Sequence, residues 1–439
     1  MRQILSSYAE KGVPEDLVAA AKRSEVAQAE FQRNSIPDLA NLWSNALAAE
    51  GRTSPEEDLD AIRKVTLADV DRVLRQYLLN ANTITASLEP VSSGQPVAAK
   101  GFGGGEQVTT APTNPVRSRH GRQAHLRSSK CRKTTSRFQT QSFLTAFDSS
   151  YAPDHTSPTV TVLGSVKHNS DLQTPPGDEG LADLLDGLYT YGTQTLDRLA
   201  FQQALDDIAA DESAGYRFLL NVLKDHFSRG VQLLADNELH PALPAQAFAI
   251  TRQKTMQFVA GNLHSPGYRT SRALDIALLP AGDPALGEAT PATISRLTLD
   301  KLKQYHAATI RADLTTIVVI GDVTPEDAKA VIERYFGDWK AVGPKPNTTL
   351  PAVPLNKPSA QNVTDAERVQ DPVVLAEQLK LNRFDHDYYP LQLGTHVLGG
   401  GFYATRLYHG MREFEQSFLK QVARIMLWRL DSAASSDAC

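Results

Sequence analysis

Two segments of this chain, 232 residues apart, share one plan, and this repeat constrains the fold more than any other feature of the sequence. Residues 65–88 and 297–320 each place a Thr-Leu pair before an aspartate-containing helical stretch, and each ends in a run rich in β-branched residues. Thr66 in the first segment corresponds to Thr298 in the second. Solenoid repeats are roughly 20 to 50 residues long, so this period predicts two copies of a whole domain. Chance similarity of two short helix–strand units is the alternative.

The chain around the first segment is predicted to be helical. Pro14 stands where a helix begins, and Ser35 is placed to cap a second helix. The apolar face of that second helix, which we expect to point inward, consists of Ile36, Leu39, Trp43 and Leu47. Ser-Pro-Glu-Glu at 54–57 has the pattern of a capping box, and residues 83–88 have the pattern of a strand.

Around the second segment, strands are predicted near 160–166, 216–222 and 315–320. Helices are predicted at 196–208, 225–238 and 297–305, and another begins at Thr324. A stripe at helical spacing is formed by Leu181, Leu184, Leu185 and Leu188. Helices mixed with separated strands predict an α+β fold built from two-layer sandwiches.

The periodicity disappears between these regions, and residues 91–157 are expected to be a basic, disordered linker. No acidic residue occurs between Glu106 and Asp148, whereas eight lysines and arginines do. Eight charges would support only salt-dependent, non-specific binding to nucleic acid. The stretch has little aromatic interleaving and no recognised fold, so no specific nucleic-acid partner is predicted.

Composition excludes several classes of protein. The chain has 41% apolar and 22% charged residues and a net charge of −5, all ordinary for a globular protein. No run approaches the roughly 18 apolar residues of a membrane span, and no secretory signal is readable at the start, which leaves the localisation open. Two cysteines, Cys131 and Cys439, are too few for a disulfide framework or a four-cysteine zinc site.

Several motifs, in order, resemble the pitrilysin/insulinase family of zinc metallopeptidases, the inverzincins. They are Thr66-Leu-Ala-Asp-Val-Asp-Arg-Val, Leu297-Thr-Leu-Asp-Lys-Leu, Val318-Val-Ile-Gly-Asp-Val-Thr-Pro-Glu-Asp, Tyr335-Phe-Gly-Asp-Trp, Asp387-Tyr-Tyr-Pro-Leu-Gln-Leu-Gly, Leu398-Gly-Gly-Gly-Phe and Arg406-Leu-Tyr. The resemblance implies repeated two-layer α/β sandwich domains of the pitrilysin/mitochondrial processing peptidase type, four in a full-length member, closing around a peptide.

Mapped onto that plan, the chain covers only part of a full-length member. The resemblance implies the later part of a peptidase C-terminal-type domain over 1–90, a non-catalytic peptidase-like domain over 158–342, the start of a further C-terminal-type domain over 361–413, and a divergent tail over 414–439. Residues 117–157 and 414–439 depart from the family pattern, which is explained either by out-of-frame translation or by genuine divergence. Full-length bacterial relatives are often periplasmic.

The family's first domain carries His-x-x-Glu-His, in which two imidazoles bind Zn²⁺ and the glutamate activates its water. On the corresponding helix of this chain, the two histidine positions are Asp183 and Gly187, and the glutamate position is Asp186. Glycine has no ligand atom, so we predict no catalytic residue, no metal ligand and no cofactor here, although active relatives use zinc. A solvated face on an apolar helix is the simpler interpretation.

Other candidate sites are weaker. No His-x-x-His or His-x-x-x-His pair exists, and His120 and His125 with Cys131 lack a folded frame for a metal. The glycine runs at 103–105 and 399–401 lack the Gly-Lys-Ser/Thr of a phosphate loop.

One binding residue is carried over from the family. Arg412 matches an arginine that reaches the scissile carbonyl in active relatives, but the tyrosine expected seven positions later is Leu419. An exposed helical arginine is the alternative.

The resemblance therefore implies a homologue of a peptide-cleaving zinc metallopeptidase that lacks the zinc-binding half and is inactive alone. The alternative is a non-catalytic peptide-binding or scaffold subunit that pairs with an active half on another chain. Its expected partners are unfolded peptides or such a half.

Overall fold

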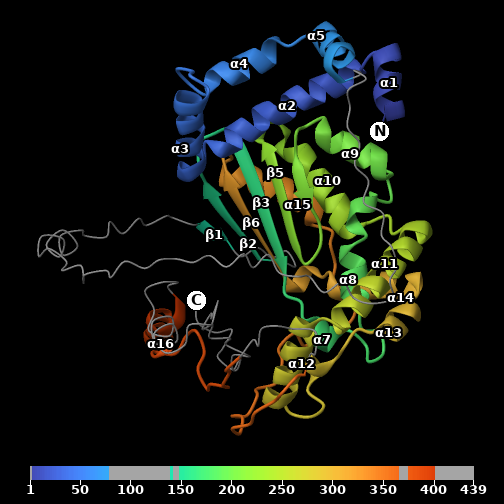
Figure 1. Ribbon diagram of the computed structural model, residues 1–439, viewed down its shortest axis with the longest axis vertical. Coiled ribbons are helices and arrows are strands. Elements are labelled where there is room, and N and C mark those ends of the chain that lie inside the picture. The colour runs from blue at the N-terminus through green and yellow to red at the C-terminus, as the bar shows by residue number, and fades with distance from the viewer. Residues whose placement is uncertain (1, 79–138, 142–147, 365–373, 401–439) are drawn as a thin grey trace, which may run out of the picture. The chain divides into compact units, whose positions relative to one another are not determined.

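The computed structural model describes residues 2–78, 139–141, 148–364 and 374–400 (Figure 1). They fall into two compact units, one from Met1–Val13 and Thr66–Phe138 and the other from Pro14–Val65 and Gln139–Cys439. The first unit contains α1 (Arg2–Lys11) and α5 (Leu67–Val73). Among the described residues, no helix is both long enough and apolar enough to span a bilayer.

The second unit is built around a six-stranded mixed sheet in the order β1-β2-β6-β3-β5-β4. The strands are β1 (Gln139–Gln141), β2 (Asp148–Pro153), β3 (Thr159–Val166), β4 (Asp211–Ser213), β5 (Arg217–Leu223) and β6 (Thr315–Gly321). β2 runs parallel to β6, and the other neighbouring pairs are antiparallel. Together with the helices around it, this sheet confirms the predicted α+β class.

Two of these strands correct the expected linker. β1 and β2 lie inside 91–157, where no regular structure was predicted, and β2 pairs with β6 along its whole length, from Asp148↔Thr316 to Pro153↔Gly321. Strand β2 reads Asp-Ser-Ser-Tyr-Ala-Pro, so it has little apolar alternation, and Tyr151 is its buried side chain. Backbone pairing with a strand far along the chain holds it in the sheet, and sequence periodicity does not register such pairing. The rest of the predicted linker and the strand predicted at 83–88 lie outside the described residues.

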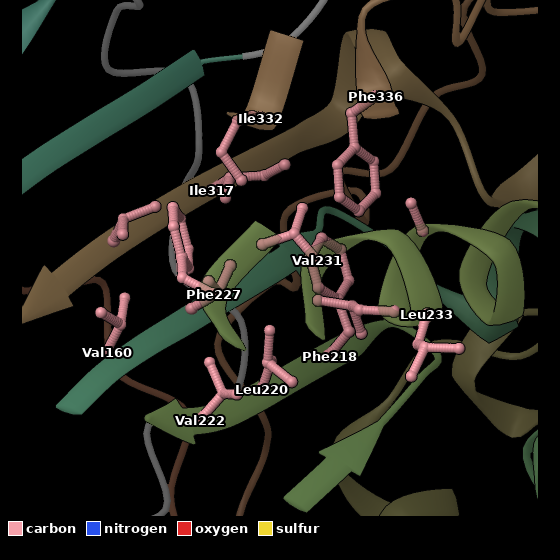
Figure 2. Close-up of a cluster of buried hydrophobic side chains, with 14 of the residues drawn as sticks. Val160, Phe218, Leu220, Val222, Phe227, Val231, Leu233, Ile317, Ile332 and Phe336 are labelled. Carbon is pink, nitrogen blue, oxygen red and sulfur yellow. The ribbon is translucent and has the colours of Figure 1, made fainter. Parts of the chain in front are cut away.

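One face of the sheet packs against α9 (Arg198–Asp206), α10 (Phe227–Leu239) and α15 (Pro325–Phe336). Figure 2 shows this core, where alternate residues of β5 point toward Val231 of α10 and Phe336 of α15. The rings of Phe218 and Phe336 stack with centroids 6.0 Å apart. Gly164 on β3 makes room for them, because a Cβ there would lie 1.9 Å from the Phe218 ring.

A second core lies beside the first. It is formed by α8 (Leu181–Asp186), α11 (Ala245–Leu263), α13 (Pro291–Ser295) and α14 (Leu299–Thr309). The four leucines of the predicted stripe are all buried in it, with at most 1% of each exposed. Phe248, Ile294, Leu302 and Tyr305 complete its centre.

The remaining described helices are α2 (Glu15–Gln32), α3 (Ile36–Ser44), α4 (Glu56–Lys64), α7 (Ser170–Gln173), α12 (Pro266–Leu278) and α16 (Tyr388–Thr395). Ser35 caps α3 as predicted, accepting a hydrogen bond from the Asp38 backbone N–H at 3.3 Å. The capping box expected at 54–57 is wrong, because Glu57 instead accepts from the backbone N–H of Thr53 at 3.0 Å.

The inner face expected for the helix from Ile36 to Leu47 is also wrong, and α3 ends at Ser44, so that Leu47 lies in the helical turn Asn45–Ala49 after it. Ile36 is 84% exposed and Leu47 54%, and Leu39 and Trp43 are more than one-third exposed. The apolar periodicity is genuine, but in the described part of the chain these side chains remain accessible to solvent.

The predicted repeat extends over four helices. The helices α2, α3, α4 and α5 correspond in order to α11, α12, α13 and α14 when the 232-residue offset is applied, and each start agrees within three residues. Thr66 and Thr298 are both N-caps, and each accepts from the backbone N–H three residues on. The helical part of the repeat is therefore present in the structure.

Candidate functional site

The resemblance in sequence predicts that α8 corresponds to the family's zinc helix; it is a short element between Gly180 and Gly187. Gly180 precedes it with φ of +105°, a backbone conformation that suits glycine. Its leucines pack into the second core, so the other side of the helix carries the positions that matter for chemistry.

Those three positions do not form a metal site. Asp183 and Asp186 lie on the exposed side of α8, and partial burial of its carboxyl together with the nearby Asp186 charge raises the pKa of Asp183. Gly187 has no side chain, and a Cβ there would meet the Thr251 Cγ2 of α11 at 3.0 Å. Gly187 therefore allows α8 and α11 to approach closely.

Across the described residues, no three side chains of His, Cys, Asp or Glu gather in a way that could hold a metal ion. Zinc sites in proteins use at least three such ligands. The residues on α8 therefore do not fit the zinc ion of active relatives.

A group of titratable side chains that no sequence pattern predicted is buried between α10, β4 and the turn after α8. Glu238, on α10, has 0% of its surface exposed. Its Oε2 accepts from the Gly215 backbone N–H at 2.7 Å, while its Oε1 has no hydrogen-bond partner among the described residues. Burial raises the pKa of Glu238 to about 8.

Glu212, on the edge strand β4, is near enough for its charge to raise the pKa of Glu238 further. It accepts from the Asn237 side-chain amide at 3.1 Å, and burial raises its pKa to about 7. Tyr189 is buried nearby, and its hydroxyl has no hydrogen-bond partner among the described residues. Burial, together with the Glu238 charge, raises the pKa of Tyr189 well above its ordinary value. One feature of the sequence could have indicated this group: Glu238 follows the buried apolar residues of α10 and lies on the same part of the helix.

A second set of polar contacts joins the two cores. The ring of His168 stacks on Tyr216 with centroids 3.5 Å apart, and its Nε2 lies 2.9 Å from the Tyr305 hydroxyl. Burial lowers the pKa of His168 to about 4. The ring therefore stays neutral at physiological pH and joins the turn between β4 and β5 to α14.

The remaining sequence candidates lie outside the described residues. These are Arg412 with Leu419, the group of His120, His125 and Cys131, and the glycines at 103–105. Arg412 stays a prediction. Gly399 and Gly400 lie in a helical turn, His396–Gly400, that follows α16, rather than between a strand and a helix as a phosphate loop requires.

Comparison with known proteins gives a match to one family model, over part of the chain. Residues 296–419 match the family model described as the peptidase M16 inactive domain. No curated protein matches the chain.

Among solved structures, the peptidase M16 inactive domain from Pseudomonas fluorescens is similar at 23% identity and a TM-score of 0.52, over 63% of this chain and 68% of that one. A protease from Helicobacter pylori gives 16% identity and a TM-score of 0.45, over 62% and 68%. The periplasmic protease PqqL from Escherichia coli gives 16% and 0.41, over 49% of this chain and 25% of its own length.

The first of these similarities shows the fold, and the family match adds a relation in sequence for residues 296–419. This part of the chain is thus similar to the inactive domain of the pitrilysin-like M16 peptidases.

Proposed function

We propose that this chain is a non-catalytic part of a pitrilysin/insulinase-type zinc metallopeptidase, inactive alone, which contributes to holding a peptide. The observation that carries the proposal is the helix α8. It keeps the leucine stripe that packs it into the domain but has Asp183, Asp186 and Gly187 at the positions of the metal-binding motif. Loss of both imidazoles and of the full-length general base removes the chemistry rather than slowing it.

The first test measures metal and turnover together. We expect the purified chain, after dialysis against a weak chelator, to hold no stoichiometric zinc by elemental analysis. We also expect no cleavage of an unfolded casein peptide, with or without added Zn²⁺. One tightly bound zinc per chain, or chelator-sensitive hydrolysis that is unchanged in Asp186→Ala, would show a metal site elsewhere in the chain.

A second candidate function is a subunit that pairs with an active half on another chain. The family match to an inactive domain favours it, because such a domain acts beside a catalytic one in the family. Titrating the chain into a separately purified zinc-binding half of an M16 peptidase tests this function. A rise in peptide hydrolysis that saturates at one chain per half supports pairing. Unchanged hydrolysis rules out this pairing and leaves the first proposal, in which the chain itself binds a peptide.

Peptide binding is measured independently of both. Fluorescence anisotropy of a labelled unfolded peptide, with the isolated chain in excess, is expected to show weak, saturable binding. No change in anisotropy up to millimolar chain would contradict the proposed role in holding a peptide.

A further inference from the structure

Two glutamates bridge the same pair of elements, the β4–β5 hairpin and helix α10, in opposite directions. Glu212 of β4 accepts from the Asn237 amide of α10, and Glu238 of α10 accepts from the Gly215 N–H in the hairpin turn. Asn237 and Glu238 are adjacent in sequence, so the two links act on one stretch of helix.

The Glu238 carboxyl is poorly prepared to carry a charge. It is fully buried, one of its oxygens has no partner in the described structure, and its one hydrogen bond comes from a neutral backbone amide. A buried carboxylate without a counter-charge is strongly disfavoured. Its ionisation therefore requires either a neutralising partner or exposure to water.

Among the residues that the structure describes, the groups whose charges interact with that of Glu238 are one carboxyl and two phenols. They are Glu212 from β4, Tyr216 just before β5, and Tyr189 just after α8. His306 of α14 approaches through Nε2, which lies 3.0 Å from the Glu238 backbone carbonyl. Burial lowers the pKa of His306, and the nearby His240 lowers it further, so its neutral form is favoured. Ionisation of Glu238 thus adds a negative charge among acidic and neutral groups.

The hairpin is the element that can yield. Strand β4 has three residues, lies at the edge of the sheet and has exposed residues at both ends. Ala209, just before it, has φ of +49°, which is unusual for a residue with a side chain. Gly215 has φ of +125°, and its position lies against the Tyr189 ring. By contrast, α10 is buried along most of its length.

We propose that Glu212 and Glu238 form a pH-dependent latch, which holds β4 and the β4–β5 turn on α10 at acidic to neutral pH and releases them as the solution becomes alkaline. The sign follows from proton binding. The closed hairpin binds more protons than the open one across the neutral range, so closing is favoured at low pH and weakens as pH rises. This inference does not depend on the proposed function.

Hydrogen exchange resolved by peptide tests the latch on the full chain. The protection factor of 209–217, corrected for intrinsic exchange with an unstructured reference peptide, is expected to fall at least tenfold between pH 6 and pH 9. Each unit of raised pKa corresponds to about a tenfold change in the opening equilibrium. Protection in the middle of α10 should fall much less.

Glu238→Gln and Glu212→Gln are near-isosteric and uncharged, so they imitate the protonated latch. The double variant is expected to retain protection of 209–217 at pH 9, whereas Glu25→Gln on exposed α2 should behave as the wild type. The proposal is overturned if the double variant loses protection as the wild type does, or if the wild type loses none.

If the variants fold poorly, the wild type itself provides the answer through ¹³C NMR of its glutamate carboxyls. Titration of both Glu212 and Glu238 in the usual range for glutamate, near pH 4 to 5, overturns the latch. Titration of the pair near or above neutrality supports it.

Discussion

The helices α2–α5 and α11–α14 follow the same succession with the same spacing, yet they differ in what covers them. Leu297 and Leu302 are fully buried, whereas the residues at the same offset, Val65 and Val70, are exposed and half-buried respectively. We call α2–α5 the first run and α11–α14 the second run. In the second run, the leucines of α8 pack against Leu297 and Leu302. Helix formation therefore needs only the local pattern, while burial needs a covering element from elsewhere in the chain.

The largest expected effect on stability comes from shortening to alanine the two side chains at one matched position, Leu302 and Val70. Leu302→Ala should lower the free energy of unfolding by about 2 to 5 kcal/mol, because it leaves a cavity in a closed core. Val70→Ala should cost under about 1 kcal/mol, because its side chain loses little contact. Urea unfolding of both variants measures the difference, and equal losses would mean that the two runs are covered alike.

A pH change should also separate the two runs. His168 packs against Tyr305 on α14, and its pKa of about 4 lies below its ordinary value near 6.5. The unfolded chain therefore binds the extra proton first, so this contribution is complete above pH 6.5 and is lost as pH falls toward 4, by about 1 to 3 kcal/mol. Residues 1–78 contain no histidine, so their helices lack this dependence.

Thermal unfolding between pH 4.5 and 7, with His168→Asn beside the wild type, measures this contribution. The variant should show a flatter profile. Exchange protection should fall in α14 but not in α2 as the pH is lowered. A wild-type profile that the substitution leaves unchanged would place the proton uptake elsewhere.

The smallest expected effect is the loss of a helix N-cap, which should lower the stability of both runs by a similar amount. Thr66→Ala and Thr298→Ala each remove a side-chain cap, and each should cost about 1 kcal/mol. Thr66 also forms a capping box with Asp69, so its loss should be slightly larger. Exchange protection in the first turn of α5 and α14 reads the effect locally, and a loss of several kcal/mol at only one of them would show that the cap carries a tertiary contact.

Much of the second unit could be predicted from sequence. The strands at 159–166, 217–223 and 315–321 and the leucine face of α8 follow from periodicity alone. Periodicity predicts no element between 239 and 296, where α11 to α13 lie, because α11 has apolar residues spread around its circumference rather than on one face. That α8 contains no histidine follows directly from its sequence, Leu-Ala-Asp-Leu-Leu-Asp.

The sequence by itself determined the local elements, their caps and the 232-residue repeat, since each of these depends on neighbours within a few residues. Only the tertiary structure decided that Val65 is exposed while Leu297 is buried, and that Asp-Ser-Ser-Tyr-Ala-Pro forms a sheet strand beside β6. It also decided that Glu238 is buried with one carboxyl oxygen that has no partner among the described residues. Burial and strand pairing depend on residues far along the chain, and the free energy of a buried charge depends on every group around it.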